Sequence, residues 1–194
     1  MLINEAGLVR AMKRAYRGEG YNVVNRGGTI AIYTKTWYLE AGRGYIPRKA
    51  LATIVEHMGE IPEAGNPVLV QKDVEAQAVM PEVSTEDLAA WVTGDHGETV
   101  VMVPVIMLGY QIFQAESGAC YGIGMTALGM IEPEEAEHWG AEVISGDRLM
   151  WDVDGERIIT RAVRKSKSGW ARAWERAVWD ALESVDLQKE EGQG

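Results

Sequence analysis

The sequence lacks the features that mark a secreted or membrane-bound protein. Its only cysteine is Cys120, which excludes an intramolecular disulfide framework and favours a reducing compartment. Residues 1–6 lack the basic head, the apolar run and the cleavage site of a secretory signal. The longest strongly apolar run, residues 100–108, is at most about half of a membrane span. We therefore expect a soluble, cytoplasmic protein with no membrane partner.

Motifs that hold a cofactor or a metal ion are incomplete. The glycine-rich residues 118–129 lack the Gly-Lys-Ser/Thr ending of a phosphate loop and the glycine spacing of a dinucleotide site. Glu135 and His138 would share one helical face, as in di-metal bundles, but the sequence has no second copy of this pair. Asp152 and Asp154 resemble part of a calcium loop that lacks its other ligands. We therefore predict no catalytic residue, no metal site and no cofactor.

Apolar residues make up 46% of the 194 residues, which is enough for a packed core. A β-hairpin is predicted with strands over residues 21–24 and 29–39, because Gly27 and Gly28 supply the positive φ of a tight turn. Alternation in the longer strand places two groups on opposite faces: Ile30 and Ile32 on one, and Tyr33, Trp37 and Leu39 on the other.

The other predicted elements are helices and short strands. Asn4 caps a first helix, a second helix starts at Pro47 and ends at Gly59, and Ser84 caps a short third one. Further strands are predicted over residues 67–71, 74–80, 100–108, 110–115, 121–131, 143–144, 149–153 and 157–163, with a hairpin turn at Asp154-Gly155. Further helices are predicted over residues 132–139 and 169–187, the latter with Trp170, Trp174, Ala177, Val178, Ala181 and Val185 on one stripe.

These elements predict an α+β fold with mainly antiparallel sheets and flanking helices. The length also allows two small subdomains. Residues 1–80 would form a basic α-β-β-α-β-β unit, and residues 84–187 an acidic, β-rich unit closed by a Trp-rich helix. Residues 188–194 are predicted to be a frayed tail.

Charge is unevenly distributed along the chain, whose net charge is −10. Residues 10–49 carry nine basic residues and two acidic ones, whereas residues 50–160 carry three basic residues and twenty acidic ones. Such asymmetry suggests one surface that faces a polyanion and another that is acidic.

Two basic segments are candidates for nucleic-acid binding. Basic side chains can hold phosphates, and interleaved tryptophans can stack on bases. The candidate residues are Arg10, Lys13, Arg14, Arg17 and Arg26 in the first segment, and Arg164, Lys165, Lys167 and Arg172 in the second. The alternative is an ordinary solvated surface with the tryptophans in the core.

The acidic residues suggest a different role. Closely spaced carboxylates can imitate phosphates and occupy the basic groove of a protein partner. The candidate residues are Glu132, Glu134, Glu135, Glu137, Asp152 and Asp154. The alternative is a solubilising surface.

Residues 20–37, together with Pro47-Arg-Lys-Ala-Leu-Ala-Thr-Ile-Val-Glu-His-Met-Gly, resemble small accessory proteins of phages and mobile elements, a set that includes anti-CRISPR-type inhibitors. The resemblance covers about the first 65 residues. It implies a non-enzymatic binding protein that covers the nucleic-acid-binding surface of a host protein, such as an RNA-guided nuclease. That set shares no common site, so the resemblance assigns no functional residue.

Two alternatives stay open. One is an accessory module that binds DNA or RNA directly through the two basic segments. The other is a small thiol enzyme, in which Cys120 is activated by His57, His96 or His138. The oligomeric state is open as well.

Overall fold

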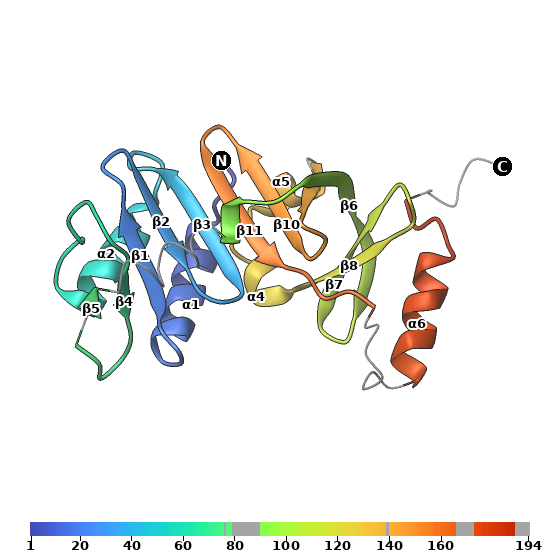
Figure 1. The fold of residues 1–194 in the computed structure, drawn as a ribbon, viewed down its shortest axis with the longest axis horizontal. Helices are drawn as coiled ribbons and strands as arrows, with labels where there is room; N and C mark the ends of the chain where they lie inside the picture. The colour runs from blue at the N-terminus through green and yellow to red at the C-terminus, as the bar shows by residue number, and fades with distance from the viewer. Residues whose placement is uncertain (76, 79–89, 139, 166–172, 189–194) are drawn as a thin grey trace.

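The computed structural model describes residues 1–75, 77–78, 90–138, 140–165 and 173–188. Its strands form one eleven-stranded sheet in the order β5-β4-β1-β2-β3-β11-β10-β9-β6-β7-β8, and neighbouring strands are antiparallel (Figure 1). The strands are β1 (Tyr21–Asn25), β2 (Thr29–Tyr33), β3 (Trp37–Gly42), β4 (Val68–Val70), β5 (Gln77–Ala78), β6 (His96–Met107), β7 (Tyr110–Ala115), β8 (Cys120–Gly124), β9 (Ala141–Ile144), β10 (Arg148–Val153) and β11 (Glu156–Arg161). The helices that lie wholly within the described residues are α1 (Glu5–Tyr16), α2 (Arg48–Met58), α4 (Met125–Leu128), α5 (Pro133–His138) and α6 (Ala173–Glu183). The predicted α+β class is confirmed.

The first two helices follow their predicted signals. Asn4 caps α1, since its side chain accepts a hydrogen bond from the Gly7 amide at 2.7 Å. Gly59 ends α2 with a φ of 92°, a left-handed conformation that glycine adopts without strain. Pro47 is the cap residue of α2 rather than its first helical residue.

The predicted hairpin between β1 and β2 is confirmed, but the predicted strand over residues 29–39 is wrong in its middle. The Thr34 side-chain oxygen accepts hydrogen bonds from the amides of Thr36 and Trp37, at 3.1 and 3.3 Å, and this turn separates β2 from β3. Ile32 then pairs with Leu39, so both point to the same face. Trp37 and Leu39 therefore join Ile32 in one core, instead of facing away from it as predicted.

The second half of the chain contains two three-stranded meanders, β6-β7-β8 and β9-β10-β11. The predicted Asp154-Gly155 turn joins β10 to β11 with φ angles of 50° and 81°. The strand predicted over residues 121–131 is shorter than expected, because α4 follows β8 directly. After β11 the chain reaches β8, where Val163 and Gly122 exchange two backbone hydrogen bonds of 2.8 Å. This bridge closes the ring of strands from β6 to β11.

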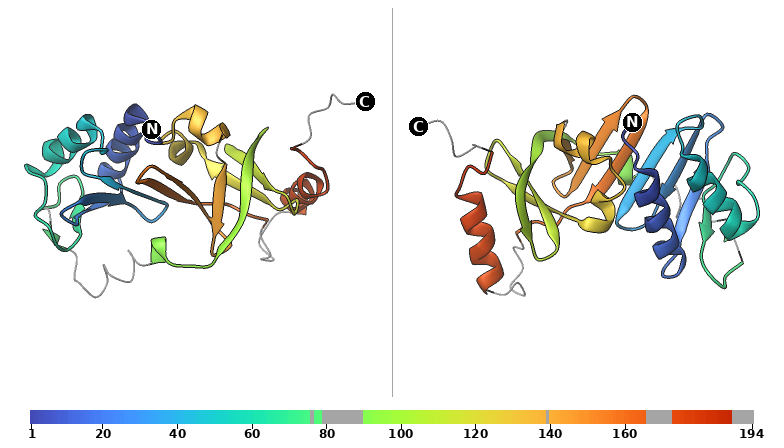
Figure 2. Two further views of the ribbon diagram at one scale, coloured as in Figure 1. Left: turned by 90° about the horizontal axis from the view of Figure 1, so that it is seen from above. Right: turned by 180° about the vertical axis from the view of Figure 1, so that it is seen from behind.

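Helices α1, α2, α4 and α5 lie together on one face of the sheet (Figure 2, left). The main core lies between them and the sheet and includes Leu8, Met12, Ile32, Leu39 and Trp151. A smaller core on the opposite face contains Tyr38, Ile159 and Trp91. Arg148 holds the Trp91 segment in place, because its guanidinium donates to the carbonyl oxygens of Ala90 and, at 2.8 Å, Thr93.

Helix α6 lies at the far end of the molecule from α2 and packs on the outer side of the ring (Figure 1). It buries Trp179 against Val103, Ile112 and Cys120. The predicted stripe is not the buried side of the helix within the described residues, since Trp174 and Val185 are 47% and 53% exposed. Apolar residues lie on two sides of α6. The side with Trp179 and Leu182 packs against the strands.

Strands from both predicted units share the sheet, because β3 pairs with β11. The predicted boundary between the units, the helix expected after Ser84 and tail residues 189–194 lie outside the described residues. No helix in the described part of the chain is long and apolar enough to cross a membrane.

The contact between α1 and α4 leaves no space for a side chain at Gly7. A Cβ there would lie 1.5 Å from the Gly129 carbonyl oxygen. We expect Gly7→Ala to lower the free energy of unfolding by about 2 kcal/mol, although alanine is the better helix former. The control is Gly18→Ala, whose Cβ would lie 3.6 Å from its nearest neighbour, the Ala15 carbonyl oxygen. Urea denaturation followed by tryptophan fluorescence measures both, and equal stabilities would contradict the close α1–α4 contact.

Candidate functional site

The basic residues of α1 divide into two pairs that lie on different sides of the helix. Residues four apart share one side of a helix, so Arg10 lies with Arg14, and Lys13 with Arg17. The Arg14 guanidinium donates to the Thr126 hydroxyl of α4 at 2.9 Å. Lys13 instead pairs with Glu56 of α2 at 3.4 Å. The first pair therefore faces α4 and the second faces α2.

The α2 side of α1 holds an aromatic cluster around His57. The His57 ring stacks on Tyr16 with centroids 3.8 Å apart, and the Tyr21 hydroxyl lies 2.9 Å from His57 Nδ1. Burial lowers the pKa of His57, and the charges of Lys13 and Arg17 act in the same direction, against Glu56. The neutral imidazole thus packs as part of the α1–α2 contact.

The α4 side of α1 borders a row of three adjacent clefts. The helix cleft, about 360 Å³, lies between α1 and α4 and is lined by Arg10, Arg14 and Thr126. The central cleft, about 560 Å³, is lined by Arg14, Lys35, Trp37, Tyr110 and Arg161. The outer cleft, about 200 Å³, is lined by Tyr110, Val163, Arg164 and Trp179. Neighbouring clefts share residues: Arg14 and Thr126 line the first two, and Tyr110 and Val163 the last two.

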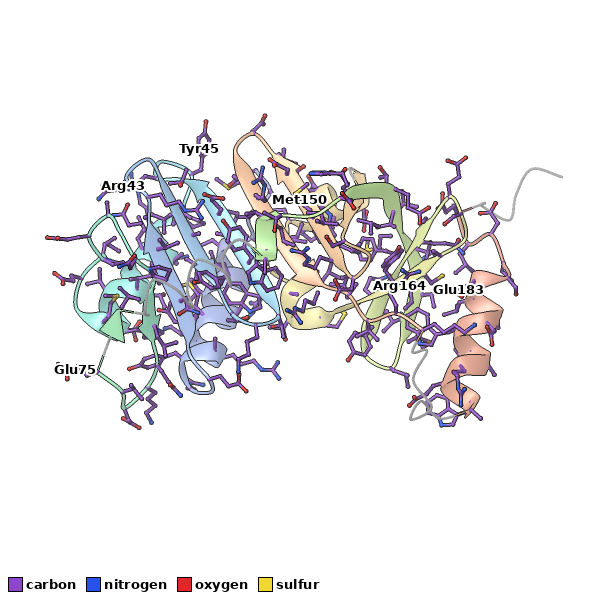
Figure 3. All side chains as sticks on the ribbon, viewed as in Figure 1. Arg43, Tyr45, Glu75, Met150, Arg164 and Glu183 are labelled. Atoms are coloured by element: carbon purple, nitrogen blue, oxygen red, sulfur yellow. The ribbon has the colours of Figure 1, made fainter. Side chains whose placement is uncertain are left out.

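The bridge at Val163 positions the second basic segment on this row. The Arg164 guanidinium carbon lies 4.6 Å from the centroid of the Tyr121 ring, beside β7 and β8 (Figure 3). The Arg161 guanidinium carbon lies 5.7 Å from the Trp91 centroid. Lys165 is turned away, since it pairs with Asp180 of α6. The structure therefore brings Arg10 and Arg14 together with Arg164 along one row of clefts.

Other predicted basic residues are elsewhere. Arg26, in the turn between β1 and β2, pairs with Glu40 of β3 at 3.1 Å. Glu40 also accepts from the hydroxyls of Thr29 and Tyr38, at 3.2 and 2.7 Å, so Arg26 belongs to a local network and not to the clefts. Lys167 and Arg172 lie outside the described residues.

Three residues of the central cleft are not among the predicted candidates: Lys35, Tyr110 and Arg161, although Arg161 begins the second basic segment of the sequence. Lys35 pairs with Glu19 at 2.9 Å, but both side chains are more than 75% exposed, so this pair contributes little stability. Tyr110 follows the turn between β6 and β7, and nothing in its local sequence distinguishes it. The neighbouring strand does carry a signal: Gly124 of β8 pairs with Tyr110, and its lack of a side chain leaves room for the tyrosine ring.

The predicted acidic residues gather around the N-terminal segment. Glu135 of α5 pairs with the Met1 amine at 3.1 Å. The neighbouring Leu2 amide donates to the Glu156 carboxylate, next to the β10–β11 turn, at 2.6 Å, so α5 and β11 both contact the N-terminal segment. Glu134, Glu137 and Asp154 are exposed and Glu132 is half-buried, whereas Asp152 is bound to Arg157 at 2.8 Å in β11.

Cys120 is buried in β8, where its thiol donates a weak hydrogen bond to the Gly118 carbonyl at 3.5 Å. Burial raises the pKa of this thiol to about 11, and the charge of Glu183 acts in the same direction. His57 on α2 is engaged by Tyr16 and Tyr21, and His96 at the start of β6 pairs with Glu142 at 2.8 Å. The described residues contain no group of three or more side chains that could hold a metal ion.

We expect the Cys120 thiol to be nearly inert in the folded protein at pH 8. Alkylation by iodoacetamide is expected to be at least about 100-fold slower than in the urea-unfolded chain, because the thiolate is the reactive form. The rate is expected to rise as the pH approaches 11. Mass spectrometry of time points measures both. Rapid stoichiometric alkylation of the folded chain would favour the thiol-enzyme alternative.

Comparison of the chain with protein-family models, with curated proteins and with solved structures found no match, so the case for a function depends on the geometry of the clefts and the acidic surface.

Proposed function

We propose that the protein is a non-enzymatic, nucleic-acid-binding protein that holds the sugar-phosphate backbone along the row of clefts. The observation that carries this proposal is the meeting of two basic segments far apart in the sequence. Arg14 of α1 lines the central cleft together with Arg161 at the end of β11. Arg10 and Arg164 line the helix cleft and the outer cleft on either side of it.

The arginines of this row are available to an anion. Among the described residues, no carboxylate forms an ion pair with Arg10, Arg14 or Arg161. Arg14 donates to a neutral hydroxyl, and Arg164 donates to the Gly146 carbonyl at 3.2 Å. A guanidinium has five donors, so each retains donors for phosphate oxygens.

The pairs on α1 provide a matched test. We expect the double variant Arg10→Gln/Arg14→Gln to weaken binding of a labelled oligonucleotide by about tenfold or more. Its salt dependence, log Kd against log salt concentration, is expected to become shallower by about 1.4 to 1.8, since two phosphate contacts are lost. Fluorescence anisotropy at several salt concentrations measures both quantities.

The control is Lys13→Gln/Arg17→Gln, which makes the same charge change on the α2 side of the same helix. It is expected to reduce affinity much less, because these side chains do not line the clefts. Equal losses in the two double variants would show that only overall charge matters. No binding by the unmodified protein at low salt would refute the proposed function.

A second candidate function is inhibition of a nucleic-acid-handling protein through the acidic surface. The observation that favours it is that α5 and the start of β11 both contact the N-terminal segment, through Glu135 with the Met1 amine and Glu156 with the Leu2 amide. Exposed carboxylates of Glu134, Glu137 and Asp154 thus come from two separate elements of the fold. Such an arrangement of carboxylates can occupy a basic groove on a partner.

If the acidic surface acts in this way, the protein is expected to prevent DNA binding by an RNA-guided nuclease at a stoichiometric ratio. The variant Glu134→Gln/Glu137→Gln/Asp154→Asn is expected to weaken that inhibition by about tenfold or more. The control neutralises three exposed acids near α2 and β5, Glu60, Glu63 and Glu75, of which Glu75 lies at the opposite end of the molecule from α6 (Figure 3). Gel-shift assays with the purified nuclease measure the effect, and equal inhibition by both triple variants would exclude this mechanism.

A further inference from the structure

Tyr110 occupies a special place between the central and outer clefts, because it lines both of them. Its ring lies across β8, where the facing residues are glycines. A Cβ on Gly122 would lie 3.1 Å from Tyr110 Cβ and 3.4 Å from its Cγ, and one on Gly124 would lie 4.0 Å from its Cε1. The ring is therefore supported by the backbone of β8, and Tyr110 as a whole is half-buried.

Cations flank this ring on both sides. Arg14 and Arg161 line the central cleft, and Arg164 lines the outer cleft. A supported aromatic face between guanidinium groups is the arrangement on which proteins stack an unpaired base while holding the phosphates beside it. Stacking of this kind requires a base that is not already stacked in a duplex.

The central cleft has the dimensions and walls of a small-molecule site. Its volume of about 560 Å³ lies within the range of sites for drug-sized ligands. Ala11, Ala15, Ala127 and Trp37 provide apolar walls. A nucleoside unit can enter such a recess, whereas the bases inside a duplex cannot.

Charge also favours a single strand. Duplex DNA carries one negative charge per about 1.7 Å of axis, twice the density of one strand. The protein has a net charge of −10, and Glu19 and Glu175 line the central and outer clefts. A duplex would bring its second strand against this acidic surface, while a single strand can replace some electrostatic attraction by stacking.

We infer that the clefts take a single-stranded nucleic acid, with one base entering the central cleft and stacking on Tyr110. This inference deepens the proposed nucleic-acid binding and depends on it. The ligand class is an unpaired DNA or RNA segment, and the arginines on either side of Tyr110 hold its backbone.

The test compares a labelled 12-nucleotide oligothymidine with a 12-base-pair duplex by fluorescence anisotropy. We expect the single strand to bind at least about tenfold more tightly. Tyr110→Leu is expected to weaken oligothymidine binding by about tenfold, because it removes the ring, while Tyr110→Phe keeps the ring and the affinity. The control Tyr45→Leu removes an exposed tyrosine outside the clefts and is expected to change affinity less than about twofold.

A second measurement uses the unmodified protein and does not depend on how the variants fold. An oligothymidine with one 5-iodouracil is irradiated in the complex, and mass spectrometry is expected to locate the cross-link at Tyr110 or Trp37. Cross-links confined to other residues, or unchanged affinity of a folded Tyr110→Leu protein, would overturn the inference. Duplex binding that equals or exceeds single-strand binding, and that is lost in Arg10→Gln/Arg14→Gln, would overturn it while leaving the proposed function intact. Absence of binding to both oligonucleotides would overturn both.

Discussion

The pairing of β3 with β11 is the contact on which the rest of the structure depends. It joins the sheet of the first 80 residues to the ring of strands, with Trp37 opposite Thr160 and Ala41 opposite Glu156. Both ends of β11 also position α1 and the clefts. At one end the Glu156 carboxylate accepts from the Leu2 amide at 2.6 Å, next to the start of α1. At the other the Arg161 amide donates to the Thr36 carbonyl at 3.0 Å, which places Arg161 at the central cleft.

Local signals predicted the fold well where a single residue determines the backbone. Asn4, Gly59 and the Asp154-Gly155 turn are examples, because a cap or a positive φ depends on few neighbours. The turn at Thr34 was missed because the Thr34 hydroxyl, which accepts the hydrogen bonds of the turn, belongs to a β-branched residue. β-Branched residues also favour strands, so the sequence around Thr34 resembles a continuous strand. The buried side of α6 was missed because two of its sides carry apolar residues, and only tertiary packing decides which one is covered.

The candidate site was predictable in part. Composition identified Arg10, Arg14 and Arg164, because an excess of basic residues is visible without any structure. Composition could not show that the basic residues of α1 face two different neighbours. Their partners, Glu56 of α2 and Thr126 of α4, are distant from α1 in the sequence. The local sequence of Tyr110 could not identify it either, because the glycine that makes room for its ring lies on β8 and becomes its neighbour only through strand pairing.

The late position of β11 has a consequence for synthesis of the chain on the ribosome. β3 ends at Gly42 and β11 begins at Glu156, so roughly 110 residues separate the two partners. At ordinary elongation rates the edge of β3 therefore remains unpaired on the order of ten seconds. An unpaired edge strand can pair with the same strand of a neighbouring chain. Nascent chains on one messenger are thus exposed to mutual aggregation until β11 has been synthesised, and release from this hazard coincides with assembly of the central cleft.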